Sequence, residues 1–167
     1  MEGLIDAFRL LDPIKSRLTL SVAGDGPQSY IDRLRSRAAG LPVKFLGHVK
    51  PGDFFPLIDL TVVPSIWNEP LGRVVIESMA FGKAVVCTPV GGMPELIKGR
   101  EGVVAKDTTP LSIAAAIGDL QRRLRDDSID ISNVARARAG EFHPERIATA
   151  YLDVFDRVAL DAPRKLN

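Results

Sequence analysis

Short apolar runs that alternate with helical segments constrain the fold of this chain more than any other feature of its sequence. Residues 60–63 (Leu-Thr-Val-Val) and 84–87 (Ala-Val-Val-Cys) are continuous apolar runs, typical of strands covered on both faces. Between them, residues 71–81 have helical apolar spacing and are followed by Gly82, which favours a helix end. Strand, helix and strand in short order indicate parallel pairing with a right-handed crossover.

The same alternation continues through most of the chain. We predict further strands at residues 18–22, 43–46 and 102–105, helices at residues 4–11 and from Pro27 to near Gly40, and a brief turn or helix at residues 53–58. Beyond Thr109 the pattern is helical, at residues 111–124, 131–142 and 145–159, with a polar break around residues 126–128. We therefore expect an α/β fold with a doubly wound, Rossmann-like parallel sheet and extra C-terminal helices.

Composition narrows the classes of protein to consider. A chain of 167 residues with 46% apolar residues fits one domain, residues 1–167, and a formal charge of +1 implies no bulk attraction to nucleic acid. The single Cys87 excludes an internal disulfide and a structural zinc site. Because we find no leader or membrane-span pattern, we expect a cytoplasmic protein. An α/β domain normally places a strand before its first helix, so we expect this domain to lack its own first strand.

The segment with the most candidate functional residues contains two carboxylates, Glu69 and Glu77. Glu69 follows a predicted buried strand, where a ligand crevice is expected, and Glu77 lies within the next helix. Between them, residues 71–74 offer free backbone N–H groups at a helix start, which favour a phosphate, and Gly72 permits its close approach. Glu77 is flanked by apolar residues and needs a partner, for which sugar hydroxyls are suitable.

Each carboxylate can also have a purely structural role. Glu69 can be a solvated loop residue or a helix cap, and Glu77 can pair with a basic group such as Arg100. A second Gly-rich turn at residues 88–95 follows the neighbouring strand and leads into a short helix. Two such turns on neighbouring strands would form one crevice, which favours the ligand-binding interpretation.

The segment from Glu69-Pro70-Leu71-Gly72 to Glu77-Ser78-Met79-Ala80 resembles the Glu-x7-Glu signature of the retaining GT-B glycosyltransferases of family 4, the glycosyl transferases group 1. Further segments also resemble segments of that family and follow one another in the same order, at residues 23–27, 43–47, 91–95 and 144–148. The resemblance covers nearly the whole chain. It implies the donor-binding half of an enzyme that moves a hexose from a nucleotide diphosphate sugar to an acceptor.

By this resemblance, Glu69 is the catalytic residue that contacts the transferred sugar, and Glu77 accepts hydrogen bonds from the ribose. The resemblance also assigns the distal phosphate and sugar to the backbone of Leu71, Gly72, Arg73 and Val74, and the diphosphate side of the cleft to Gly24 and Gly26. It implies no metal and no cofactor, because amides and basic side chains neutralise the leaving diphosphate. Arg73 either supplies positive charge or points to solvent. His48 and Trp67 are either close to the donor or ordinary surface residues.

The resemblance also implies parts that precede residue 1. These are an N-terminal acceptor domain and a loop that carries the phosphate-clamping Arg and Lys, and any peripheral membrane contact would come through that domain. A noncatalytic nucleotide-binding or interaction module remains the alternative, while an epimerase or phosphorylase of the same fold fits the Glu-x7-Glu pair less well. We expect exposed surfaces at Glu69 and at Tyr151, Val154 and Phe155 of the last helix, and self-association through that helix is a hypothesis.

Overall fold

The structure, a computed structural model, describes residues 1–125 and 130–161, so the polar break predicted around residues 126–128 lies outside the described residues. In chain order the elements are α1 (Glu2–Leu10), β1 (Leu20–Ala23), α2 (Gln28–Arg37), β2 (Val43–Gly47), α3 (Pro51–Phe54), the 3-10 helix η1 (Phe55–Leu57), β3 (Leu60–Val63), α4 (Arg73–Ala80), β4 (Ala84–Cys87), α5 (Met93–Leu96), β5 (Gly102–Val104), α6 (Pro110–Leu124), α7 (Ile131–Gly140) and α8 (Pro144–Asp161).

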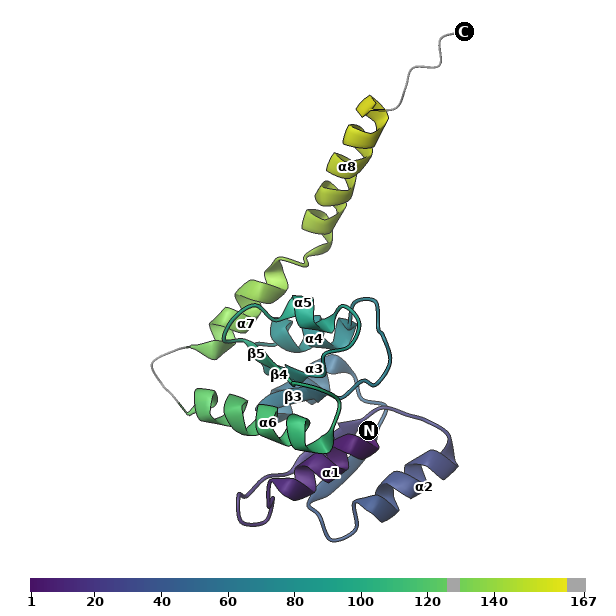
Figure 1. The fold of residues 1–167 in the computed structure, drawn as a ribbon, viewed down its shortest axis with the longest axis vertical. Helices are drawn as coiled ribbons and strands as arrows, with labels where there is room; N and C mark the ends of the chain where they lie inside the picture. The colour runs from purple at the N-terminus through teal and green to yellow at the C-terminus, as the bar shows by residue number, and fades with distance from the viewer. Residues whose placement is uncertain (126–129, 162–167) are drawn as a thin grey trace.

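Helices cover both faces of the parallel strands β3, β4 and β5 (Figure 1). One apolar cluster joins α1 and α6 to one face of β4, and a second cluster joins α4, α5 and α7 to the other face. Strand β4 is consequently buried along all four residues, as its continuous apolar run predicts. The α/β class and the helices on both faces of a parallel sheet are confirmed.

The sheet is divided between β1 and β3. Within residues 1–125 and 130–161, strand β1 pairs with β2 alone, and β3 pairs with β4, which pairs with β5, all in parallel. Strand β3 is therefore less buried than β4: Thr61 and Val63 are buried, whereas Leu60 and Val62 are partly exposed. The expectation that residues 60–63 are covered on both faces holds only in part, because a strand with one neighbour keeps an open edge.

Helix boundaries differ from the predicted ones where glycine or proline sets the backbone. Helix α4 begins at Arg73 rather than Leu71, because Gly72 adopts a left-handed conformation (φ 66°, ψ 57°) as its N-cap. Pro27 is the N-cap of α2 rather than its first helical residue, and α2 ends at Arg37. Gly40 (φ 77°) lies in the turn that follows.

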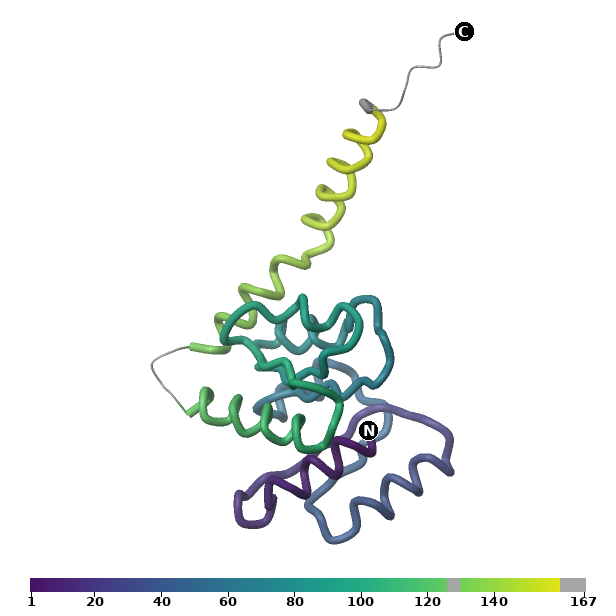
Figure 2. The backbone as a smooth tube through the Cα atoms, viewed as in Figure 1, coloured from purple at the N-terminus to yellow at the C-terminus, as the bar shows by residue number. Residues whose placement is uncertain are grey.

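The last helix, α8, projects away from the rest of the molecule (Figure 1), and the backbone trace shows it leaving α7 without folding back (Figure 2). Its apolar side chains are accordingly exposed, among them Tyr151, Val154 and Phe155. This exposure was expected from the sequence. Across residues 1–125 and 130–161, we find no helix with the length and hydrophobicity needed to cross a bilayer.

Candidate functional site

The two Gly-rich turns that follow β3 and β4 are in direct contact. The Gly92 N–H donates to the Glu69 carbonyl at 3.0 Å, and the Gly91 N–H donates to Asn68 Oδ1 at 3.3 Å. A Cβ at Gly91, whose φ is 59°, would lie 2.1 Å from the Glu69 carbonyl oxygen. The predicted juxtaposition of the two turns is confirmed, and glycine at position 91 permits it.

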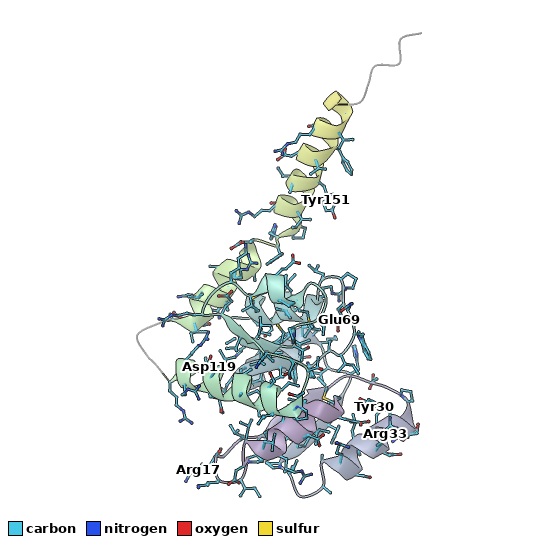
Figure 3. The ribbon with its side chains drawn as sticks, in the orientation of Figure 1. Arg17, Tyr30, Arg33, Glu69, Asp119 and Tyr151 are labelled. Atoms are coloured by element: carbon cyan, nitrogen blue, oxygen red, sulfur yellow. The ribbon has the colours of Figure 1, made fainter. Side chains whose placement is uncertain are left out.

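The Glu69 carboxylate is held by residues that the sequence interpretation did not include. Ser65 Oγ donates a hydrogen bond to Glu69 Oε1. Thr88 Oγ1 in turn donates to the Ser65 carbonyl at 2.6 Å, so the turn after β4 holds the loop after β3. Glu69 is half-buried and lies in the loop beside the strand ends (Figure 3). The sequence signal that could have revealed these contacts is the pair of hydroxyl residues just after the two strands, Ser65 after β3 and Thr88 after β4.

The N-terminus of α4 carries no side-chain cap in the described part of the chain. The Gly72 carbonyl accepts the Val75 N–H at 2.9 Å, while Leu71, Arg73 and Val74 around it are exposed. Backbone N–H groups in such a first turn are available to an anion. Gly72 itself is buried, and a Cβ there would lie 2.4 Å from Met93 Cγ. Backbone conformation and contact with Met93 thus already require this glycine, apart from any approaching phosphate.

Glu77 is paired with Arg73 on the same helix. Arg73 Nε lies 3.1 Å from Glu77 Oε1, and the Glu77 side chain keeps 33% of its surface exposed. The alternative partner considered from the sequence, Arg100, does not form this ion pair. Because the Arg73 side chain is 84% exposed, the pair contributes at most a few tenths of a kcal/mol, about what exposed i,i+4 pairs give.

A cavity of about 1050 Å³ brings Gly24, Val74 and Glu77 to one space, which His48 also lines. A smaller cavity of about 150 Å³ lies at the end of β1 and is lined by Gly24 and Gly26. Gly24 has a φ of 126° and donates its N–H to the Gly47 carbonyl at 2.7 Å.

The other predicted residues lie outside both cavities. Glu69, Leu71, Gly72 and Arg73 line neither of them, and Trp67 is 67% exposed at the surface. The structure therefore brings the predicted residues together in two groups. One group is at the contact of the two Gly-rich turns, and the other lies along the large cavity and the smaller cavity at the end of β1.

Two further observations limit the chemistry that the described residues offer. Burial raises the pKa of the Cys87 thiol to about 11, so this thiol stays protonated and unreactive at neutral pH. Over residues 1–125 and 130–161, His, Cys, Asp and Glu side chains form no group of three able to hold a metal ion. The expectation that the site needs no metal stays a prediction.

Comparison with known proteins identifies the family. Residues 1–123 match the model of the glycosyl transferases group 1. The chain belongs to this family. Over 92% of its length it is 30% identical to glycogen synthase of Mycobacterium tuberculosis, and it spans 39% of that relative. Over 74% of its length it is 30% identical to lipopolysaccharide 1,2-N-acetylglucosaminetransferase of Salmonella typhimurium, and it spans 35% of that relative.

Solved glycosyltransferase structures have the same fold. The Anabaena protein HepE in complex with UDP and glucose superposes with a TM-score of 0.70 at 26% identity, covering 93% of this chain and 43% of that protein. A glycosyltransferase from Rickettsia africae superposes with a TM-score of 0.79 at 22% identity, covering 96% and 44%. The glycosyl transferases group 1 chain described here thus spans less than half the length of the relatives it matches.

Proposed function

We propose that this chain is the donor-binding part of a retaining glycosyltransferase that moves a hexose from a nucleotide diphosphate sugar to an acceptor. The proposal rests on one observation: the uncapped N-terminus of α4 lies between two carboxylates, Glu69 and Glu77. Ser65 holds the first of these carboxylates, and the second lines the same cavity as Gly24. An anion site flanked by two carboxylates suits a ligand with a diphosphate between two polyhydroxylated groups.

The diphosphate is assigned to the first turn of α4. The backbone N–H groups from Leu71 to Val74 would hold the phosphate that bears the sugar, through hydrogen bonds and the helix dipole. Gly24 and Gly26, at the end of β1, would line the opposite side of the diphosphate. Exposed Leu71, Arg73 and Val74 support this assignment, because they leave the helix start open to solvent.

Ribose binding would exchange the partner of Glu77. In the free chain the Glu77 carboxylate is paired with Arg73. Two ribose hydroxyls would replace Arg73 as donors to this carboxylate, and the released guanidinium could then turn towards the diphosphate. The exchange needs little energy, because the exposed Arg73–Glu77 pair is weak.

Glu69 would contact the hydroxyls of the transferred sugar and orient its anomeric carbon. The hydrogen bond from Ser65 limits the freedom of the Glu69 side chain before the donor arrives, which favours precise positioning. Transfer itself requires an acceptor site and exclusion of water, which we assign to parts of the full-length enzyme beyond this chain. We therefore propose donor binding for residues 1–167 and the complete reaction only for a longer protein in the cytoplasm.

Calorimetric titration of the chain with UDP, GDP and ADP tests this function. We expect saturable binding of one nucleotide, weakened roughly tenfold in Glu77→Ala, because the ribose hydroxyls lose a charged acceptor. Glu145→Ala is the matched control, since it removes an equally charged carboxylate that is 90% exposed on α8. Absence of binding to all three nucleotides by the folded chain would contradict the proposal and favour a noncatalytic interaction module.

A further inference from the structure

The loop between β3 and α4 is restrained by hydrogen bonds near both of its ends. Thr88 Oγ1 donates to the Ser65 carbonyl at 2.6 Å, at the start of the loop. Further along, the Gly92 N–H donates to the Glu69 carbonyl at 3.0 Å. The Ser65 hydroxyl also donates to the Glu69 carboxylate, so the Glu69 side chain reaches back towards the start of the loop. Residues 66–68 therefore form a short excursion between two fixed points.

Trp67 lies at the middle of this excursion and is exposed. The backbone bends at Trp67, and 67% of the surface of this residue is accessible to solvent. The next residue, Asn68, accepts the Gly91 N–H through Oδ1 at 3.3 Å, which limits the freedom of the loop beside the tryptophan. A backbone held by the neighbouring turn thus presents a large aromatic side chain to solvent.

The Trp67 ring has no structural role in the described part of the chain. Within residues 1–125 and 130–161, none of the three buried apolar clusters includes Trp67. Over the same residues, its ring takes part in no aromatic pair and no cation–π contact. The ring is therefore available to a ligand.

Trp67, Asn68 and Glu69 together offer the groups that recognise a sugar ring. A pyranose ring has faces of C–H groups and an edge of hydroxyls, and the C–H groups are attracted to the electron-rich face of an indole. With Oδ1 engaged, the Asn68 NH₂ group can donate to one hydroxyl, and Glu69 Oε2 can accept from another. Three successive residues thus supply a stacking face, a donor and an acceptor.

Trp67 is located for the hexose of the donor rather than for its nucleotide. Glu77 and Gly24 line the large cavity, whereas Trp67 and Glu69 line neither of the two cavities. In the proposed function the ribose binds at Glu77 and the transferred hexose at Glu69. Because Trp67 precedes Glu69 by two residues in the same restrained loop, it belongs to the hexose end of the donor.

We propose that Trp67 is a stacking platform for the transferred hexose, with the Asn68 NH₂ group as a hydroxyl donor beside it. This inference rests on the proposed donor-binding function and adds a specificity-determining residue to it. The loop is restrained before the ligand arrives, so stacking requires little further ordering of the protein. The platform distinguishes a nucleotide sugar from the free nucleotide, because only the nucleotide sugar carries a ring that can stack on Trp67.

Calorimetric titration tests the platform with two ligands that share one base. The pairs are UDP and UDP-glucose, GDP and GDP-mannose, or ADP and ADP-glucose, according to the base that the chain binds. In Trp67→Leu we expect the Kd of the nucleotide sugar to rise roughly fivefold and the Kd of the nucleotide to stay unchanged. Trp67→Phe should retain most of the affinity, because it keeps an aromatic face. Ile66→Ala, at a neighbouring position that is 68% exposed, is the control and should change neither Kd.

Tryptophan fluorescence follows the same site directly, because Trp67 is the single tryptophan of the chain. We expect the nucleotide sugar to change this fluorescence more than the nucleotide does. A response to maltotriose but not to the nucleotide sugar would overturn the assignment to the transferred hexose and favour an acceptor sugar.

The titrations separate failure of the platform from failure of the proposed function. If the unmodified chain binds a nucleotide, and Trp67→Leu weakens both ligands of the pair equally or weakens neither, the stacking role is wrong while donor binding stands. If the unmodified chain binds no nucleotide, the proposed function fails and this inference fails with it.

Discussion

At the scale of single residues, Gly72 shows how one backbone conformation supports the start of α4. Its φ of 66° is left-handed, and a Cβ added to it would lie only 2.4 Å from Met93 Cγ, so both features oppose any larger residue. We expect Gly72→Ala to destabilise the chain by about 2–4 kcal/mol in urea unfolding, through backbone strain and a clash with a fully buried side chain. Such a change would also displace the turns on which Glu69 lies.

Gly40→Ala is the matched control for the Gly72 prediction. Gly40 has a similar φ of 77°, but a Cβ there would meet nothing within 4 Å. Gly40→Ala should lower the free energy of unfolding by only about 1–2 kcal/mol, the cost of the left-handed conformation alone. In a background that carries Met93→Ala, Gly72→Ala should lower the free energy of unfolding by less than it does in the unmodified chain, because the side chain that clashes is gone. Equal losses in the two glycine variants would show that contact with Met93 contributes nothing.

At the scale of elements, the buried Arg138 side chain joins α7 to the short helix α5. Arg138 Nε donates to the Leu96 carbonyl and Nη2 donates to the Glu95 carbonyl, both at 2.8 Å, so α7 binds the end of α5. Nη1 also contacts Glu141. These donations satisfy carbonyls that the short helix α5 cannot satisfy itself.

Arg138→Lys should lower the free energy of unfolding by about 2–3 kcal/mol, because a single ammonium group cannot reach both carbonyls. Exchange of the α7 amides should accelerate in the same variant. Arg136→Lys is the control on the same helix, at an exposed position where the side chain donates to Ser132 Oγ, and should change stability by less than about 0.5 kcal/mol. A similar loss in both variants would refute a special role for Arg138.

At the scale of the whole molecule, α8 presents an apolar stripe to solvent. The stripe repeats at helical spacing, and its members are between 40% and 64% exposed: Ile147, Tyr151, Val154, Phe155 and Val158. An exposed apolar stripe of this kind marks an interaction surface. For the isolated chain, we expect concentration-dependent self-association through α8.

Sedimentation equilibrium measures this association. Replacing both Tyr151 and Phe155 by Ser should weaken it roughly tenfold or more, because large aromatic side chains dominate such contacts. The control replaces both Arg146 and Arg157 of the same helix by Ser and should retain association. A clean monomer of the unmodified chain at high concentration would rule out this role of the stripe.

Much of the architecture was predictable because the decisive signals are local. Apolar runs at residues 60–63 and 84–87 mark strands, and the glycines at positions 72 and 91 lie in turns whose backbone requires them. The contact of the two Gly-rich turns also followed, since parallel strands end at the same edge of a sheet. These inferences need only the order of residues and the geometry of a parallel sheet.

The sequence by itself determined the α/β alternation, the helical C-terminal third and the position of the Glu69–Glu77 segment after a strand. Only the tertiary structure decided that Thr88 holds the loop of Ser65 and Glu69, that the turns after β3 and β4 touch through Gly91 and Gly92, and that the sheet divides between β1 and β3. The physical reason is distance along the chain: periodicity and turn chemistry act between neighbouring residues, whereas a hydrogen-bond partner or an open strand edge depends on which distant segment lies beside it.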